Sequence, residues 1–216
     1  MNNINYDKKL EEVIKKIADN NELPTLLLHS CCAPCSSYIL EYLSNFFKIT
    51  VFFYNPNIHP YSEYIARLKE QKRLISEIKA KNYIKFIEGI YNQEEFYKTV
   101  AGLEKVPEGG ERCFKCYKMR LLETAKMAHN GKYDYFTTTL TVSPYKKAAK
   151  VNEIGKNLAD EFDVAYLFSD FKKREGYKKS IEVSKKYNLY RQNYCGCVFS
   201  KMVNKLTHCN KAKNVF

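Results

Sequence analysis

Seven of the eight cysteines lie in three short groups, and such spacing is typical of metal binding or redox chemistry. The groups are Cys31-Cys32 with Cys35, Cys113-x-x-Cys116, and Cys195-Gly196-Cys197. A C-x-x-C pair lets two sulfurs converge on one metal, whereas two adjacent cysteines chelate poorly and need further ligands. Four thiolates suit tetrahedral zinc or a 4Fe-4S cluster, and an adjacent pair is unusual for a zinc knuckle. The expected metal ligands are Cys31, Cys32, Cys113 and Cys116.

The third group predicts different chemistry. A disulfide between Cys195 and Cys197 would close a very small ring and would be reduced easily. Gly196 would relieve the backbone strain of that ring. We therefore interpret Cys195 and Cys197 as a catalytic dithiol, with two further metal ligands as the alternative. Cys35 could be a metal ligand, a redox partner or a packed thiol.

Several charged residues stand beside the cysteines. Arg112, Lys115, Lys118 and Arg120 would favour thiolates by lowering the cysteine pKa, or would form a solvated helix face. His29 directly precedes the first cysteine group and is a candidate proton donor, although a histidine at a strand end more often has a structural role. Cys209 is expected to be incidental.

The cysteine count also bears on the compartment. The N-terminus lacks the apolar stretch of a secretory signal, and no run approaches the roughly 18 apolar residues of a membrane span. We therefore expect a cytoplasmic protein without a membrane partner. In a reducing compartment, eight cysteines are explained by metal or redox chemistry better than by a disulfide framework.

The chain is basic. It has 36 Lys and Arg against 24 Asp and Glu, a net charge of +12. This excess indicates a polyanionic partner such as nucleic acid, or it supplies only a soluble surface.

Alternating apolar strands and amphipathic helices must position these groups. The expected strands are 25–29, 48–54, 83–87, 133–139 and 164–168. The expected helices are 7–19, 36–46, 61–81, one that starts near 93, 115–129 and 145–159. The pattern predicts an α/β fold: one doubly wound, mainly parallel, Rossmann-like sheet with helices on both faces. We expect a single domain over residues 1–216, with the basic helical C-terminal third, about 170–216, packed on it.

Sheets of this class place their sites beyond the carboxyl ends of the strands. Cys31, Cys32 and Cys35 follow the first strand, and Cys113 begins the helix after the third, so we expect one shared crevice. An ATP-dependent sulfur transferase is disfavoured, because the loop after the first strand is not Gly-rich and no P-loop motif exists. A cysteine hydrolase would not explain three cysteine groups.

Several blocks in the same order resemble the cobalamin-independent epoxyqueuosine reductases, the QueH family. The blocks are 29–35 (HSCCAPC), 54–60 (YNPNIHP), 113–117 (CFKCY), 136–140 (FTTTL) with Ser143-Pro144, 170–173 (DFKK) and 190–197 (YRQNYCGC). The resemblance implies reduction of the epoxide of epoxyqueuosine at the wobble base of tRNA, the last step of queuosine biosynthesis. It implies a 4Fe-4S cluster on the four ligands named above, and a redox-active disulfide between Cys195 and Cys197.

The resemblance also implies a second iron beside the cluster, for which Cys35, Asp134 or Asp170 could supply ligands. An external low-potential electron donor is expected. Proton donors for the departing oxygen would be His29, Tyr38 or a cysteine thiol.

Basic and aromatic residues are the expected tRNA contacts. Lys172, Lys173, Arg174 and Lys146 would contact phosphates, and Tyr145 or Tyr177 would stack on an unstacked base. The alternative to this whole interpretation is a zinc-structured RNA-binding module without redox activity.

Overall fold

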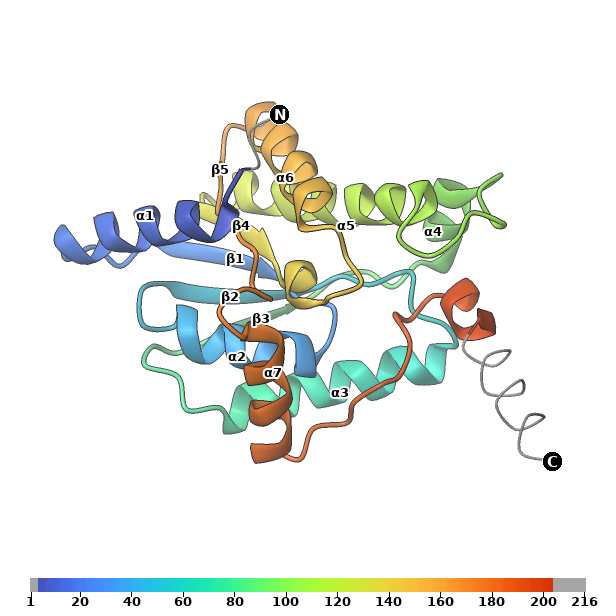
Figure 1. The fold of residues 1–216 in the computed structure, drawn as a ribbon, viewed down its shortest axis with the longest axis horizontal. Helices are drawn as coiled ribbons and strands as arrows, with labels where there is room; N and C mark the ends of the chain where they lie inside the picture. The colour runs from blue at the N-terminus through green and yellow to red at the C-terminus, as the bar shows by residue number, and fades with distance from the viewer. Residues whose placement is uncertain (1–3, 204–216) are drawn as a thin grey trace.

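The computed structural model describes residues 4–203, which are built around one five-stranded sheet with all strands parallel (Figure 1). The strands are β1 (Thr25–His29), β2 (Lys48–Phe53), β3 (Lys85–Glu88), β4 (Tyr135–Thr138) and β5 (Ala165–Tyr166). Their spatial order is β3-β2-β1-β4-β5. The α/β, doubly wound parallel fold predicted from the sequence is confirmed.

Helices cover both faces of the sheet. They are α1 (Tyr6–Asp19), α2 (Ala33–Leu43), α3 (Tyr61–Glu77), α4 (Gln93–Val100), α5 (Glu111–Asn130), α6 (Ala148–Phe162) and α7 (Gly176–Lys186), with a 3₁₀ turn η1 (Thr139–Val142) after β4. Leu26 and Leu28 of β1 face α1, α2 and α3, while Leu27 faces α5 and α6. All three side chains are fully buried, which explains the uninterrupted apolar run of this central strand. Within the described range, no helix is both long enough and apolar enough to cross a membrane.

Two helices begin earlier than predicted, and both boundaries matter for the site because they place cysteines within the helices. Helix α2 begins at Ala33 rather than at 36, with Cys32 as its N-cap, so Cys35 lies in its first turn. Pro34 fits this turn because the first helical residues need no backbone N–H donor. Helix α5 begins at Glu111 rather than at 115, so Cys113 and Cys116 both lie inside it, one turn apart.

The strand order reverses at β1, which has β2 on one side and β4 on the other. His29 at the end of β1 lies in register with Thr138 at the end of β4. The two chain segments that follow, the Cys31 turn and η1, therefore leave the sheet side by side. Such a switch point is where open parallel sheets bind ligands.

The C-terminal part of the described chain consists of helix α7 and an irregular segment that returns to the cysteine groups. Helix α7 packs against α2. Residues 187–197, which we call the C-terminal strap, have no regular secondary structure and run along α3 toward a helical turn at 198–203 (orange to red in Figure 1). The strap carries Cys195 back to the carboxyl edge of the sheet. Cys209 lies outside the described residues.

Asp134 lies at the amino-terminal edge of the sheet, opposite the edge where the cysteines lie, so it cannot help to hold an iron there. It precedes β4, and its Oδ2 accepts from both the backbone N and the Oγ1 of Thr25, each at 2.7 Å. Thr25 starts β1, whereas the cysteines follow the end of that strand. The expectation that Asp134 could be a metal partner is therefore wrong.

This position leads to a prediction about stability. The hydrogen bonds from Thr25 hold the pKa of the Asp134 carboxyl below its ordinary value, so their contribution is present above that value and is lost as the pH falls through the lowered one. Because Asp134 is exposed, we expect Asp134→Ala to lower the free energy of unfolding by only about 1 kcal/mol at neutral pH. Urea unfolding at neutral pH and near pH 3 should show the difference shrinking in acid, while metal content is unchanged. An equal loss at both pH values would contradict the assignment.

Candidate metal and redox site

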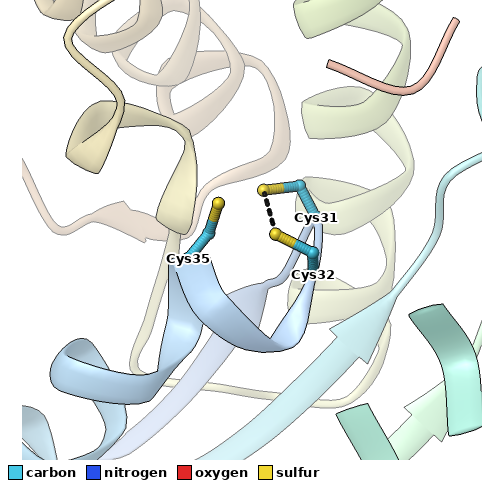
Figure 2. Close-up of side chains that lie close together, drawn as sticks. All are labelled: Cys31, Cys32 and Cys35. Atoms are coloured by element: carbon cyan, nitrogen blue, oxygen red, sulfur yellow. Dashed lines mark hydrogen bonds between the residues drawn. The ribbon is translucent and has the colours of Figure 1, made fainter. Parts of the chain in front are cut away.

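Three thiols meet at the start of α2. The sulfurs of Cys31, Cys32 and Cys35 all lie within 4.8 Å of one another, and those of Cys31 and Cys32 are 3.8 Å apart (Figure 2). Three sulfurs bound tetrahedrally at about 2.3 Å from one metal would lie about 3.8 Å apart, so Cys31 and Cys32 already have this spacing and Cys35 lies close enough to complete the group. Of the three roles left open for Cys35, the structure supports membership in this thiol group.

The three thiols have pKa values that are shifted in different directions. The neighbouring thiols of Cys32 and Cys35 donate toward the sulfur of Cys31 and hold the pKa of Cys31 well below its ordinary value. Burial raises the pKa of Cys32 to about 12, and the interaction with Cys31 raises the pKa of Cys35. Thr139 of η1 supports Cys31 from the other side, with its Oγ1 3.3 Å from the backbone N of Cys31. Cys31 is therefore the thiol of the group that ionises most readily, and a metal would displace the protons of the other two.

Cys113 and Cys116 lie outside this three-thiol group, on α5. Burial raises the pKa of both, to about 11 for Cys116, although Arg120 acts in the opposite direction on Cys116. Arg112 and Arg120 act in the expected direction, but burial outweighs them, so the expectation of lowered pKa values for Cys113 and Cys116 is wrong. Arg112 and Arg120 are buried, whereas Lys115 and Lys118 form an exposed face of the helix.

The two sulfurs of the C-x-C group face different surroundings. Cys195 lines the cavity that Cys31 and Cys35 also line, whereas Cys197 packs in a small apolar cluster with Cys116 and other residues of α4 and α5. Burial raises the pKa of Cys197 to about 12. Gly196, between them, has a φ of +129°, a value that side chains rarely adopt.

A cavity of about 610 Å³ opens at the switch point of the sheet. Cysteines line it from two directions: Cys31 and Cys35 from the start of α2, and Cys195 from the strap. The segment after β4 forms a third wall with Tyr145 and Lys146. The cavity therefore joins residues that are more than 160 positions apart in the sequence.

Arg120 places a buried positive charge on this cavity. Its side chain is 1% exposed, its Nε donates to the carbonyl of Cys116 at 3.3 Å, and its Nη1 donates to Asn55 at 3.4 Å. Its Nη2 has no hydrogen-bond partner among the described residues. A buried guanidinium without a paired carboxylate is costly unless an anion compensates it. The groups that interact with its charge most strongly are the sulfurs of Cys116, Cys195 and Cys31.

Lys146 adds a second positive charge. Burial acts to lower the pKa of Lys146, but the surrounding acidic groups, led by the sulfurs of Cys195 and Cys31, together outweigh burial and raise it. A donor set of several thiols flanked by two cations fits a thiolate-bound metal or an anionic iron–sulfur group. The four ligands expected from the sequence would thus come from two thiol groups that face the same pair of cations.

Neither predicted proton donor reaches the cavity. His29 is fully buried, with its Nδ1 2.8 Å from Oγ1 of Thr138 and its Nε2 3.1 Å from the carbonyl of Tyr54. The Tyr54 contact assigns the proton to Nε2, and burial lowers the pKa of His29 to about 3. The ring is therefore a neutral structural link between strands. Tyr38 lines a different cavity, of about 430 Å³, together with Asp170.

The predicted tRNA contacts separate into free and paired residues. Tyr145 is 77% exposed and lines the cavity at the switch point of the sheet together with Lys146. Lys172 pairs with Asp170 at 2.7 Å, and Arg174 pairs with Asp7 at 2.9 Å and with Glu11. Lys173 is exposed and lines a neighbouring hollow of about 840 Å³.

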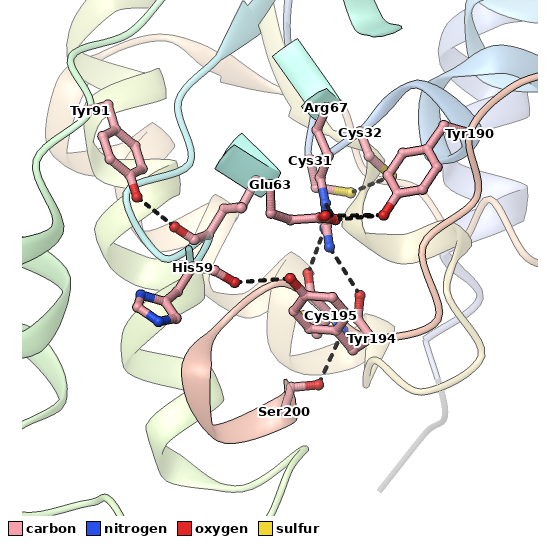
Figure 3. A network of polar contacts seen from close by, with 11 residues as sticks. Cys31, Cys32, His59, Glu63, Arg67, Tyr91, Tyr190, Tyr194, Cys195 and Ser200 are labelled. Atoms are coloured by element: carbon pink, nitrogen blue, oxygen red, sulfur yellow. Dashed lines mark hydrogen bonds and ion pairs between the residues drawn. The ribbon is translucent and has the colours of Figure 1, made fainter. Parts of the chain in front are cut away.

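Sequence reasoning missed the residues that hold the strap, above all Glu63 and Arg67 of α3 (Figure 3). Nothing in their local spacing distinguishes them from an ordinary i, i+4 pair on a helix surface. Burial is the signal that reveals Arg67, since its side chain is 1% exposed.

Known proteins resemble this chain over most of its length. Residues 26–203 match the family model "Epoxyqueuosine reductase QueH". A protein named epoxyqueuosine reductase QueH from Staphylococcus epidermidis is 47% identical, covering 92% of this chain and 85% of its own length. A protein of the same name from Streptococcus pyogenes is 44% identical, covering 91% and 78%, and one from Thermotoga maritima is 34% identical, covering 85% and 94%.

Proposed function

The chain belongs to the epoxyqueuosine reductase QueH family, and from that premise we propose that it reduces the epoxide of epoxyqueuosine, carried at the wobble base of tRNA, to the alkene of queuosine. It is an oxidoreductase of queuosine biosynthesis. The observation that carries the finer proposal is the shared cavity, in which the thiols of Cys31 and Cys35 face Cys195. A zinc-structured module without redox activity does not explain this arrangement.

The proposed reaction requires two electrons and two protons, because the epoxide oxygen leaves as water. Oxidation of the Cys195 and Cys197 thiols to a disulfide releases two electrons and two protons. Epoxide and dithiol are thus converted to alkene, water and disulfide, with atoms and electrons balanced. The position of Cys195 on the cavity wall supports its role as the substrate-facing thiol. An external low-potential donor must then reduce the disulfide before the next turnover.

The proposed cofactor is a 4Fe-4S cluster, with a second iron beside it. The ligands proposed for the cluster are Cys31, Cys32, Cys113 and Cys116, with Cys35 available for the second iron. When bound, these groups supply one-electron steps and an iron that can polarise the epoxide oxygen. Arg120 and Lys146 would balance the negative charge, and Arg120 keeps one N–H free for a sulfur or an oxygen in the cavity. With His29 buried, the protons would come from the cavity thiols.

The cavity rim supports entry of a single unstacked base. Tyr145 and Tyr177 both line the cavity with exposed side chains, and both rings could stack on a base. Tyr145 and Lys146 also line the neighbouring hollow, which extends to Lys172 and Lys173. We propose that the base enters the cavity lined by the cysteines, while the tRNA backbone passes over the neighbouring hollow lined by Lys172 and Lys173.

The two lysines give a measurable prediction. A Lys172→Ala, Lys173→Ala double variant should bind tRNA more weakly, and the slope of log affinity against log salt should flatten by about 0.7 to 0.9 for each phosphate that the variant no longer neutralises. Most of the change is expected from Lys173, since Lys172 is paired with Asp170. Filter binding over a salt series measures both quantities.

Lys156→Ala provides the matched control, because Lys156 is an exposed lysine of α6 that pairs with Asp160. Its salt slope should equal that of the unaltered protein. If the double variant matches this control, the lysines do not contact tRNA.

The function itself is tested by anaerobic incubation of the protein with tRNA that carries epoxyqueuosine, together with a strong reductant. Nucleoside mass spectrometry should show loss of one oxygen atom, and the protein should absorb broadly at about 400 nm. Colourless protein with stoichiometric zinc and no conversion would favour the RNA-binding alternative.

A further inference from the structure

The C-terminal strap is held in place by side chains of α3 rather than by structure of its own. At one end, Arg73 Nη2 donates to the carbonyls of Tyr187 and Asn188 at 3.1 and 3.2 Å. Glu70 accepts from the backbone N of Tyr190 at 2.6 Å. Arg73 in turn pairs with Glu70 and Glu77, so this attachment is an ion-pair network on the exposed side of the helix.

At the other end, the attachment is buried and reaches the dithiol. Arg67 donates from Nη1 to the carbonyl of Cys195 at 3.1 Å and from Nη2 to that of Tyr194 at 3.4 Å, and its guanidinium lies 5.1 Å from the Tyr194 ring centroid (Figure 3). Its Nε donates to Glu63 at 2.7 Å. Glu63 also accepts from the hydroxyl of Tyr190 at 3.0 Å. A planar guanidinium used in three directions fixes both position and orientation.

The loop before α3 completes the attachment. The backbone N of His59 donates to the carbonyl of Gly196 at 2.8 Å, and the hydroxyl of Tyr194 donates to the carbonyl of His59 at 2.9 Å. A Cβ at Gly196 would lie 3.1 Å from Nη1 of Arg67. The glycine thus permits both the backbone angle and the close approach of the guanidinium.

Arg67 also lies between two cysteine groups. Its charge interacts with Cys32, in the three-thiol group, and with Cys195. The same side chain therefore holds the backbone of the dithiol through the carbonyl of Cys195, and its positive charge also acts on the sulfur of that residue. Glu63, on the far side of the guanidinium, partly offsets that charge.

We propose that Arg67, held by Glu63, is a positioning residue that presents Cys195 to the cavity and sets the balance between the dithiol and disulfide forms of Cys195 and Cys197. This inference rests on the dithiol role given under the proposed function. A cation beside a thiolate stabilises the reduced form and so makes the disulfide a stronger oxidant. Removing the cation should favour the disulfide, whereas removing its carboxylate partner should favour the dithiol.

The test equilibrates anaerobically purified protein in glutathione buffers of defined ratio, where glutathione disulfide oxidises the dithiol and is itself reduced to two thiols. Alkylation and mass spectrometry then give the fraction of Cys195 and Cys197 in each form. For Arg67→Gln we expect a shift of about 10-fold toward the disulfide, or about 30 mV for this two-electron couple. Arg67→Lys, which keeps the charge, should stay within about 3-fold of the unaltered protein, and Glu63→Gln should shift about 3-fold toward the dithiol.

Arg73→Gln is the matched control, because Arg73 lies on the same helix and holds the same strap eight residues before Cys195. It should leave the equilibrium unchanged. Opposite shifts in the Arg67→Gln and Glu63→Gln variants cannot arise from partial unfolding, which would move both in one direction. The inference is overturned if Arg67→Gln has no effect, if Arg73→Gln has the same effect, or if both α3 variants shift together. If the unaltered protein forms no disulfide at any ratio, the dithiol role in the proposed function fails instead.

Discussion

Replacing Cys31 with alanine is expected to abolish the proposed iron binding and the proposed epoxide reduction together. Cys31 is one of two thiols of the three-thiol group that line the cavity, and its lowered pKa makes it the thiol that ionises most readily. Loss of an outer-shell partner already costs 10- to 100-fold in metal affinity, so loss of this ligand should reduce activity by about 1000-fold or more. Iron analysis, the absorption spectrum and conversion of epoxyqueuosine tRNA measure the three consequences.

The control for Cys31→Ala is Cys209→Ser, which removes a cysteine to which we assign no role. It should keep the iron, the colour and the activity. Retention of full iron content and activity by Cys31→Ala would show that the three-thiol group is not the metal site, whatever its geometry allows.

Replacing Cys195 with serine should separate metal binding from turnover. We expect this variant to keep its iron, because Cys195 is proposed as a redox thiol and not as a ligand. Steady-state conversion of tRNA should fall by at least about 100-fold, since serine cannot form the disulfide that completes the two-electron reaction. Iron content and conversion, measured on the same sample, give the two results.

Cys197→Ser provides a companion to this variant, because Cys197 packs beside Cys116 away from the cavity. It should retain iron and lose turnover to a similar extent. Loss of iron in either variant would make the C-x-C group part of the metal site, which is the alternative that the sequence left open. Normal turnover in both would remove the dithiol from the mechanism.

Much of the fold follows directly from the sequence, because buried parallel strands leave a strong local signal. The apolar run 25–29 is β1 at its predicted bounds, and its central place in the sheet explains why it has no polar face. Elements with weaker sequence patterns have bounds that differ from the predicted ones. The strand predicted over 164–168 has only two residues, Ala165–Tyr166, because it lies at the edge of the sheet beside β4.

The candidate site was less accessible to sequence reasoning, since it depends on contacts between distant residues. The three cysteine groups are visible as spacing, but their division into a close thiol group, a pair on α5 and a dithiol on the strap is not. His29 illustrates the limit: its position beside the cysteines suggested proton transfer, while its two buried hydrogen bonds indicate a structural role. Arg67 gave no signal at all, because its importance lies in carbonyls 127 and 128 positions away.

The C-terminal strap has a consequence for the order in which the molecule can be assembled. A nascent chain that has been synthesised only as far as α7 already contains β1, α2 and α5, and with them the three-thiol group and both cysteines of the helix. It lacks the wall that Arg191 and Cys195 add to the cavity. A metal can therefore reach the three-thiol group before the strap closes the cavity, and the Cys195-Gly196-Cys197 group is the last of the cysteine groups at the site to be synthesised.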